Sequence, residues 1–341
     1  MISNIGNIYH RTGDHARAEM MYLRSLSIRE KNLGKEHRDL ISPLNSLGFL
    51  YIHKEDYRKA EDVLKRALEI GERRLGPEDS TLVQSLTYLA NAYTDMGDYV
   101  KAALLYQRAL AIREKNGSLN QSEGATLLEK FATLRFLMGD FEKAEPMYRR
   151  ALATREKALG AEHPDVAQAA YGMAHLHLSK GNFFEAEALL NRSIAIWEKR
   201  GGPGQPEIAS ALRHLAEIYR ARGEYRLSEE SLQRGLDILR KRYGADSYLA
   251  DHLLSLATHY VDLGDYTKAD SFYRQAVQII EAKLGQSHPL IAEALRQWAT
   301  SSQARGDITA VFARIRIGRL RKPMDIGRKF KTDFSFERKP L

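Results

Sequence analysis

Histidines are the side chains in this sequence best suited to bind a metal ion or to move protons near neutral pH. His175 and His177 stand two residues apart in a predicted helix, so they point to different faces, whereas two ligands of one ion need a spacing of three or four. His37, His163 and His288 recur in linkers between helices, where turn formation explains them. The sequence has no cysteine, which excludes disulfides and thiolate ligands. We therefore expect no metal centre.

The sequence gives equally weak evidence for a phosphate-binding loop or an acid-base pair. The glycine-rich stretch from Gly201 to Pro206 lacks the Lys-Ser/Thr pair of a phosphate-binding loop. Many Glu-Lys and Arg-Glu neighbours lie on predicted helix surfaces, and no pair stands out as a general acid and base. The sequence predicts a protein that is not an enzyme and that needs no cofactor.

A repeated block of about 42 residues positions all of these side chains. Its anchor is a turn, typically Gly-Asp-aromatic, at Gly13, Glu55, Gly97, Gly139, Gly181, Gly223, Gly264 and Gly306. A small residue follows five positions after the first seven anchors, at Ala18, Ala60, Ala102, Ala144, Ala186, Ser228 and Ala269. Regular spacing with small residues predicts stacked, closely packed helices.

The block from Gly139 to Asn182 illustrates the helices of one repeat. Apolar residues spaced by three and four predict one helix, which ends at Gly160, and Pro164 is suited to the first turn of the next helix, the first of the following pair. No strand pattern interrupts the series. The predicted fold is all-α, an α-solenoid of antiparallel helix pairs.

Signature residues within the block resemble those of the tetratricopeptide repeat. A Leu-small-x-x-Tyr pattern stands at Leu47, Gly48 and Tyr51, at Leu89, Ala90 and Tyr93, at Leu215, Ala216 and Tyr219, and at Leu256, Ala257 and Tyr260. Small, bulky and small residues stand at Ala60, Leu64 and Ala67, at Ala102, Tyr106 and Ala109, and at Ala144, Tyr148 and Ala151. The 42-residue form is similar to the variant of kinesin light chains. The resemblance implies a right-handed superhelix that binds proteins and lacks catalysis.

Two regions are predicted along the chain. Residues 1–312 form an array of about eight repeats, of which the first is truncated and the last is degenerate, with Ser302 and Val311 at signature positions. Residues 313–341 form a basic, flexible tail with ten basic and three acidic residues, so the tail carries +7 of the net charge of +8. The array is close to neutral.

The resemblance also implies that a concave groove is lined by residues of each first helix that lie off the packing stripe. The candidates are Asn45, Phe49, Asn91, Lys130, Phe136, Tyr171, His175, Arg213, Glu217 and Arg220. Asn45 and Asn91 match positions where members of the family hold a peptide backbone. The competing interpretation is that these are solvated polar positions.

Aromatic and cationic residues among these candidates favour an acidic or aromatic-containing peptide as ligand. A clamp for a C-terminal carboxylate is not predicted, since Lys130 is the one basic residue near the two asparagines.

The tail could bind nucleic acid or another anionic surface through Arg314, Arg316, Arg319, Arg321, Lys322, Arg328, Lys329 and Lys331. Alternatively, it is a solvating terminus or folds back on the groove.

The leading hypothesis is an adaptor that binds peptide segments of another protein. A sensor or regulatory module of a larger effector system is the alternative, and nucleic-acid binding through the tail is the third. No apolar run approaches the length of a membrane span and the N-terminus lacks a secretory signal, so we predict a cytoplasmic protein. The sequence leaves the partner's identity, the oligomeric state and the completeness of the N-terminus open.

Overall fold

A computed structural model describes residues 2–202, 204–243, 247–284 and 289–304. Over these ranges the chain forms α-helices and one 3-10 helix, with no strand, which confirms the all-α prediction. The chain divides into two compact units at Gly160. The first contains α1 (Ile2–Arg11), α2 (His15–Leu33), η1 (Arg38–Leu40), α3 (Ile41–His53), α4 (Tyr57–Leu75), α5 (Leu82–Met96), α6 (Tyr99–Lys115), α7 (Ser122–Leu137) and α8 (Phe141–Leu159). The second contains α9 (Pro164–Ser179), α10 (Phe183–Gly201), α11 (Pro206–Ala221), α12 (Tyr225–Tyr243), α13 (Ser247–Asp262), α14 (Tyr266–Leu284) and α15 (Pro289–Ala304).

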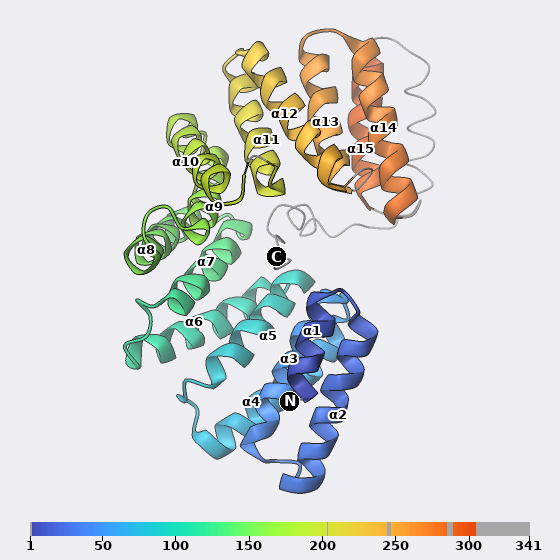
Figure 1. Ribbon diagram of the computed structural model, residues 1–341. Helices are drawn as coiled ribbons and strands as arrows, with labels where there is room; N and C mark the ends of the chain where they lie inside the picture. The colour runs from blue at the N-terminus through green and yellow to red at the C-terminus, as the bar shows by residue number, and fades with distance from the viewer. Residues whose placement is uncertain (1, 203, 244–246, 285–288, 305–341) are drawn as a thin grey trace. The chain divides into compact units, whose positions relative to one another are not determined.

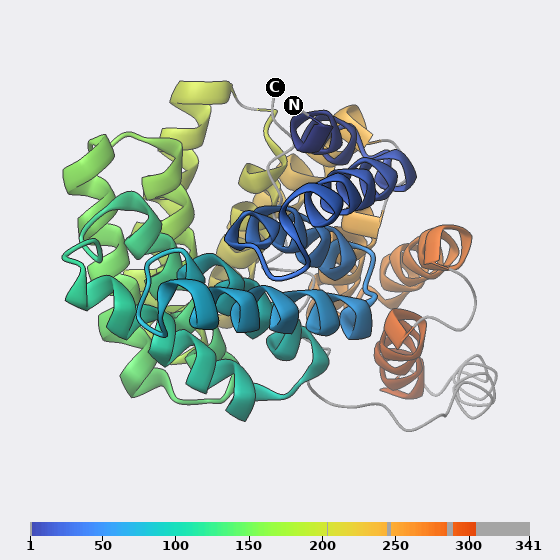
Figure 2. The same ribbon diagram turned by 90° about the horizontal axis from the view of Figure 1, so that it is seen from below.

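Helices pair along the chain into hairpins. In the first unit α1 packs on α2, α3 on α4, α5 on α6 and α7 on α8, and the second helix of one hairpin packs on the first helix of the next (Figure 1). The second unit repeats this pattern from α9 to α15. Figure 2 shows the α1–α8 helices of the first unit from below. Each unit is therefore a stretch of α-solenoid, as predicted.

The predicted turns connect the two helices of each hairpin. Gly97 adopts a left-handed conformation with φ of 83°, and the side chain of Asp98 accepts a hydrogen bond from the backbone N–H of Lys101. Glu55 occupies the same place in its hairpin with φ of 56° and is the one non-glycine residue with positive φ in the described chain. A side chain is strained in this conformation, so Glu55 costs some stability.

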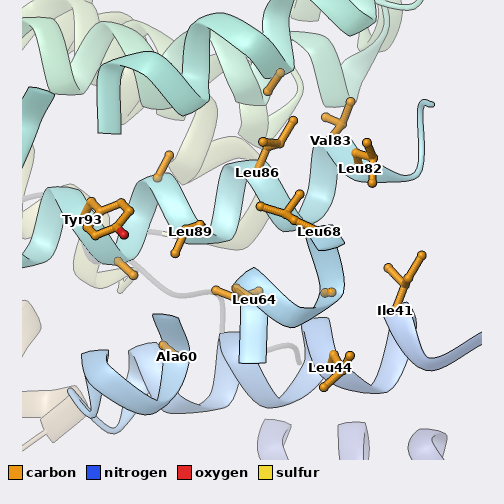
Figure 3. Packing of buried hydrophobic residues seen from close by; sticks show 14 of the residues in the cluster. Ile41, Leu44, Ala60, Leu64, Leu68, Leu82, Val83, Leu86, Leu89 and Tyr93 are labelled. Atoms are coloured by element: carbon orange, nitrogen blue, oxygen red, sulfur yellow. The ribbon is translucent and has the colours of Figure 1, made fainter. Parts of the chain in front are cut away.

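Small residues allow the close approach of the two helices in each hairpin. The seven predicted crossing residues, Ala18, Ala60, Ala102, Ala144, Ala186, Ser228 and Ala269, are all fully buried. Figure 3 shows Leu64 and Leu68 of α4 directed between α3 and α5. A Cβ atom on Gly48 would lie 2.5 Å from Leu64, so this glycine makes room for the leucine against the backbone of α3. The crossing-residue prediction is confirmed.

Signature tyrosines tie four of the hairpins to the one before each of them. The tyrosine hydroxyl of the first helix donates to a glutamate that directly follows the crossing residue of the preceding second helix. These bonds join Tyr51 to Glu19 at 2.9 Å, Tyr93 to Glu61 at 2.7 Å and Tyr219 to Glu187 at 3.1 Å, and Tyr260 bonds Glu229 in the same way. In α7 both partners differ, because Arg135 replaces the tyrosine and Ala103 replaces the glutamate.

Arginines on the second helices form another link between hairpins. Arg66 Nη2 lies 2.6 Å from Glu30 Oε1, and Arg108 Nη1 lies 2.5 Å from Glu72 Oε1. Both arginines also donate to a backbone carbonyl of the preceding linker. The sequence alone suggested an ordinary solvated surface for these charges, whereas partners about one repeat apart hold the linkers in place.

None of the described helices is long and apolar enough to cross a membrane. The second helix of the degenerate last repeat and the basic tail lie outside the described residues.

Candidate functional site

The ten predicted groove residues lie on first helices, but their exposure differs. Lys130 and Glu217 are exposed, and Phe49, Asn91, Arg213 and Arg220 are half-buried. Asn45, Phe136, Tyr171 and His175 are buried. The eight basic residues predicted in the tail lie outside the described part of the chain. Buried members support their neighbours more readily than they contact a ligand, so the proposed surface rests on the exposed and half-buried residues.

Asn45 on α3 takes part in a buried link to α5. Its Oδ1 atom accepts a hydrogen bond of 2.7 Å from the Ser85 hydroxyl, and both residues are buried. Its Nδ2 atom lies 3.5 Å from Gln84 Oε1. This network satisfies the amide within the protein. Asn45 therefore joins two hairpins.

Asn91 on α5 is joined to the second helix of its own hairpin. Its Oδ1 atom accepts a hydrogen bond of 2.5 Å from the Tyr106 hydroxyl. The same bond recurs at equivalent positions, from Tyr22 to Asn7 at 2.7 Å and between Tyr148 and Thr133 at 2.9 Å. The amide group of Asn91 makes no other hydrogen bond within the described residues, so its two N–H donors are not used there.

Aromatic rings and histidines gather on one face of α1, α3 and α5. The Phe49 ring stacks on Tyr88 with centroids 5.1 Å apart and meets His53 edge-on at 4.1 Å. His10 Nε2 and His53 Nδ1 lie 2.7 Å apart. We call the surface carrying Phe49, His53, Tyr88, Asn91 and Lys130 the first-helix face.

Two histidines at the first-helix face have lowered pKa values. Burial lowers the pKa of His53 to about 4, and nearby His10, His15 and Lys130 add to this shift. Burial and the charge of His15 also lower the pKa of His10. Both effects keep these rings neutral at pH 7, so Lys130 supplies the positive charge beside an aromatic surface.

Sequence reasoning missed Tyr88, His53 and His10. Tyr88 stands 42 residues before Lys130, so it shares the register of a residue that was identified. That register was the signal available in the sequence. The contacts of His10 and His53 depend on how α1 stacks against α3.

The second unit carries a polar cluster on α11. His214 Nε2 lies 3.0 Å from the Tyr171 hydroxyl and 3.4 Å from Arg213 Nη2. Partial desolvation raises the pKa of Glu217, but His214 and the charges of Arg213 and Arg220 outweigh it, so the pKa is lowered overall. The carboxylate stays charged at neutral pH.

Arg220, on the same helix, lies 2.8 Å from Asp262 of α13. Arg213, Glu217 and Arg220 thus form a partly neutralised set of charges.

Among the described residues, no group of three histidine or carboxylate side chains could hold a metal ion. A cavity of about 940 Å³ runs along α12, lined by charged residues such as Arg226, Glu230 and Asp237. Arg226 and Glu230 already pair at 2.6 Å. None of the predicted groove residues lines this cavity.

Family models match most of the repeat array. A tetratricopeptide repeat model matches residues 1–73, 39–115, 124–183 and 165–241, and a second model with the same description matches residues 249–290. The matches cover more than half of the chain. The chain belongs to the tetratricopeptide repeat family. Tetratricopeptide repeats are in general non-catalytic scaffolds for protein interactions.

Solved structures agree with this tetratricopeptide fold. The chain is 23% identical to a putative kinesin light chain from Podosopora anserina, with a TM-score of 0.54, covering 61% of this chain and 98% of that one. It is 17% identical to the quorum sensor NprR from B. thuringiensis, with a TM-score of 0.66, covering 82% and 75%. It is 20% identical to a Rap protein solved with Competence and Sporulation Factor, with a TM-score of 0.59, covering 89% and 85%. These likenesses concern the fold alone. No curated protein sequence matches the chain.

Proposed function

We propose that this tetratricopeptide protein is an adaptor that holds an extended, acidic peptide segment of a partner protein on the first-helix face. The observation that carries the proposal is the stacked pair Phe49 and Tyr88, with the exposed Lys130 on the neighbouring first helix. Aromatic rings and a cation supply most of the binding energy in many interfaces. An aromatic side chain of the peptide would stack on Tyr88 while a carboxylate approaches Lys130.

Hydrogen-bonding groups on the same face suit a peptide backbone. The amide N–H groups of Asn91 would donate to a peptide carbonyl, since its oxygen is already bonded to Tyr106. Such contacts are each modest, so affinity would come from several hairpins acting together. The proposal places this activity in the cytoplasm, as the sequence predicts.

Affinity capture from native lysate treated with nuclease tests this function. The variants Lys130→Glu and Tyr88→Ala are expected to lose a discrete bound protein that the parent chain retains. Lys157→Glu is the matched control, because Lys157 is also exposed and lies on α8 of the same hairpin as Lys130. Capture that survives both changes, or is equally lost in the control, would contradict the proposal.

A sensor module is the second candidate. The solved structure of a quorum sensor with the same fold gives this candidate its support. A sensor would change the activity of an effector when its peptide binds, whereas an adaptor only brings two partners together. Measuring the activity of the captured partner with and without this chain separates the two.

The basic tail supplies the third candidate, binding of nucleic acid. It predicts that deletion of residues 313–341 abolishes binding with a steep salt dependence. Binding that persists after deletion would exclude it.

A further inference from the structure

Three of the linkers between hairpins carry a glutamate that pairs with a cation of the next second helix. The two partners stand 37 residues apart each time. The pairs are Glu36 with Arg73 at 2.9 Å, Glu162 with Lys199 at 2.6 Å, and Glu78 with Lys115. In these hairpins the glutamate side chain joins the linker to the helix that packs beside it.

A second cation, next in sequence to the first, binds the backbone of the same glutamate. Arg74 Nε donates to the Glu36 carbonyl at 3.0 Å, and Arg200 Nε donates to the Glu162 carbonyl at 3.2 Å. One acidic residue therefore serves two adjacent cations, the first with its carboxylate and the second with its carbonyl oxygen.

The linker between α10 and α11 lacks this glutamate. Gly204 stands at its place, 42 residues after Glu162. In the linker before α7 the same place is taken by Asn120, whose side chain accepts a hydrogen bond from Arg150. A Cβ atom on Gly204 would meet no other atom within 4 Å. The space that a linker side chain fills elsewhere is therefore open at Gly204.

The two cations are nevertheless present on α12. Lys241 and Arg242 stand 37 and 38 residues after Gly204, at the register of the cations that hold the linker glutamates. Both are exposed, and neither forms an ion pair or a hydrogen bond within the described residues. The neighbouring Arg234 keeps its pairing with Glu198 of α10. The change from glutamate to glycine thus leaves two adjacent cations without their acceptor.

The cavity along α12 lies at this open place, and we call it the α12 cavity. Its lining includes Gly204, Lys241 and Arg242, and its volume is about 940 Å³. The cavity at the same register of the second hairpin, where Glu36 and Arg73 are both present, is about 580 Å³. The larger volume agrees with the loss of the glutamate side chain.

We propose that the α12 cavity binds an acidic residue of a partner peptide. The side-chain carboxylate would pair with Lys241 and the backbone carbonyl of the same residue would accept from Arg242, as a linker glutamate does in the other hairpins. Because both acceptors belong to one residue, a peptide suits the site better than a free anion. Asp237 also lines the cavity and repels a carboxylate, but the two cations outnumber it.

The α12 cavity belongs to the second unit and shares no residue with the first-helix face. Failure of either proposal would therefore leave the other standing.

A nuclear magnetic resonance titration of the full chain labelled with ¹⁵N-glycine tests the proposal. The probe is acetyl-Gly-Glu-Gly-amide, and the peptide with glutamine in place of glutamate is its uncharged match. The reporters are the amides of Gly202 and Gly204, at low ionic strength because salt screens exposed charges. We expect saturable shifts with a dissociation constant in the millimolar range, and binding of the glutamine peptide that is weaker by about fivefold or more.

Four variants locate the binding. Lys241→Gln combined with Arg242→Gln is expected to weaken it about fivefold or more. Arg240→Gln is the matched control, because Arg240 is also exposed on α12 but does not line the cavity. Asp237→Asn is expected to strengthen binding about twofold, since it removes a like charge. Gly204→Glu restores the linker carboxylate and should abolish the shift of the remaining reporter.

Several results would overturn the proposal. The two peptides bind equally well, neither binds, or binding is unaffected by Gly204→Glu or by the loss of both cations. A loss of binding in Arg240→Gln as large as in the double variant would show attraction to the general charge of the helix. Inorganic phosphate that shifts the same amides at lower concentration than the peptide would assign the cavity to free anions instead.

Discussion

The link between Asn45 and Ser85 makes a quantitative prediction about how two hairpins are joined. Ser85→Ala leaves the Oδ1 atom of a buried asparagine without its 2.7 Å hydrogen bond. Leaving a buried polar group unsatisfied costs about 1–3 kcal/mol. Asn45→Ala removes the other partner at a similar cost. Because both changes break one interaction, the double variant should lose less than the sum, with a coupling energy of about 1 kcal/mol.

Hydrogen exchange of α3–α6 is the suitable assay, because repeat arrays open locally as well as globally. Each single change is expected to lower amide protection there by about tenfold, as about 1.4 kcal/mol corresponds to a factor of ten. Ser46→Ala is the control, since its hydroxyl only bonds the Ser42 carbonyl of the same helix. Strictly additive effects, or unchanged protection in Ser85→Ala, would refute the inter-hairpin role of Asn45.

Three more predictions concern the turn at Glu55, the titration of His53 and the hydrogen bond of Tyr93. Glu55→Gly should stabilise its hairpin by about 1 kcal/mol in local exchange, because glycine accepts a φ of 56° without strain; a loss of protection there would count against this. Burial lowers the pKa of His53 from 6.5 to about 4, so the unfolded chain binds a proton that the folded chain does not. The first unit should therefore lose stability as the pH falls from about 6.5 to about 4, with His53→Phe flattening the pH dependence of unfolding, and an unchanged profile would speak against it. Tyr93→Phe should lower the free energy of local opening between α4 and α5 by about 1 kcal/mol, because it removes the 2.7 Å hydrogen bond to Glu61. Tyr225→Phe serves as a control in the other unit.

Periodicity made most of the fold predictable. The recurring anchor and the small residue five positions later were sufficient to place the helix pairs, and Ala60 and Ala102 are fully buried as expected. A fixed repeat fixes local structure because each hairpin contacts mainly its neighbours. The left-handed turn at Glu55 could also be located, since the repeat sets its place where a glycine is otherwise found.

The candidate site was less predictable, because register identifies a position but does not give its partner. Asn45 and Asn91 were placed on the correct helices, yet their hydrogen bonds reach Ser85, 40 residues away, and Tyr106, 15 residues away. Those partners depend on how side chains meet across helices. The same reason explains why the pairing of Arg108 with Glu72 looked like an ordinary charged surface in the sequence.

Site-specific photo-crosslinking tests the central claim most directly, that the first-helix face binds a partner protein. A photoreactive phenylalanine would replace Tyr88 in one chain and the exposed Val100 in another, and both would be irradiated in nuclease-treated lysate. The account predicts a discrete crosslinked protein from position 88 and none from position 100. A crosslink from position 100 with none from position 88 would contradict it.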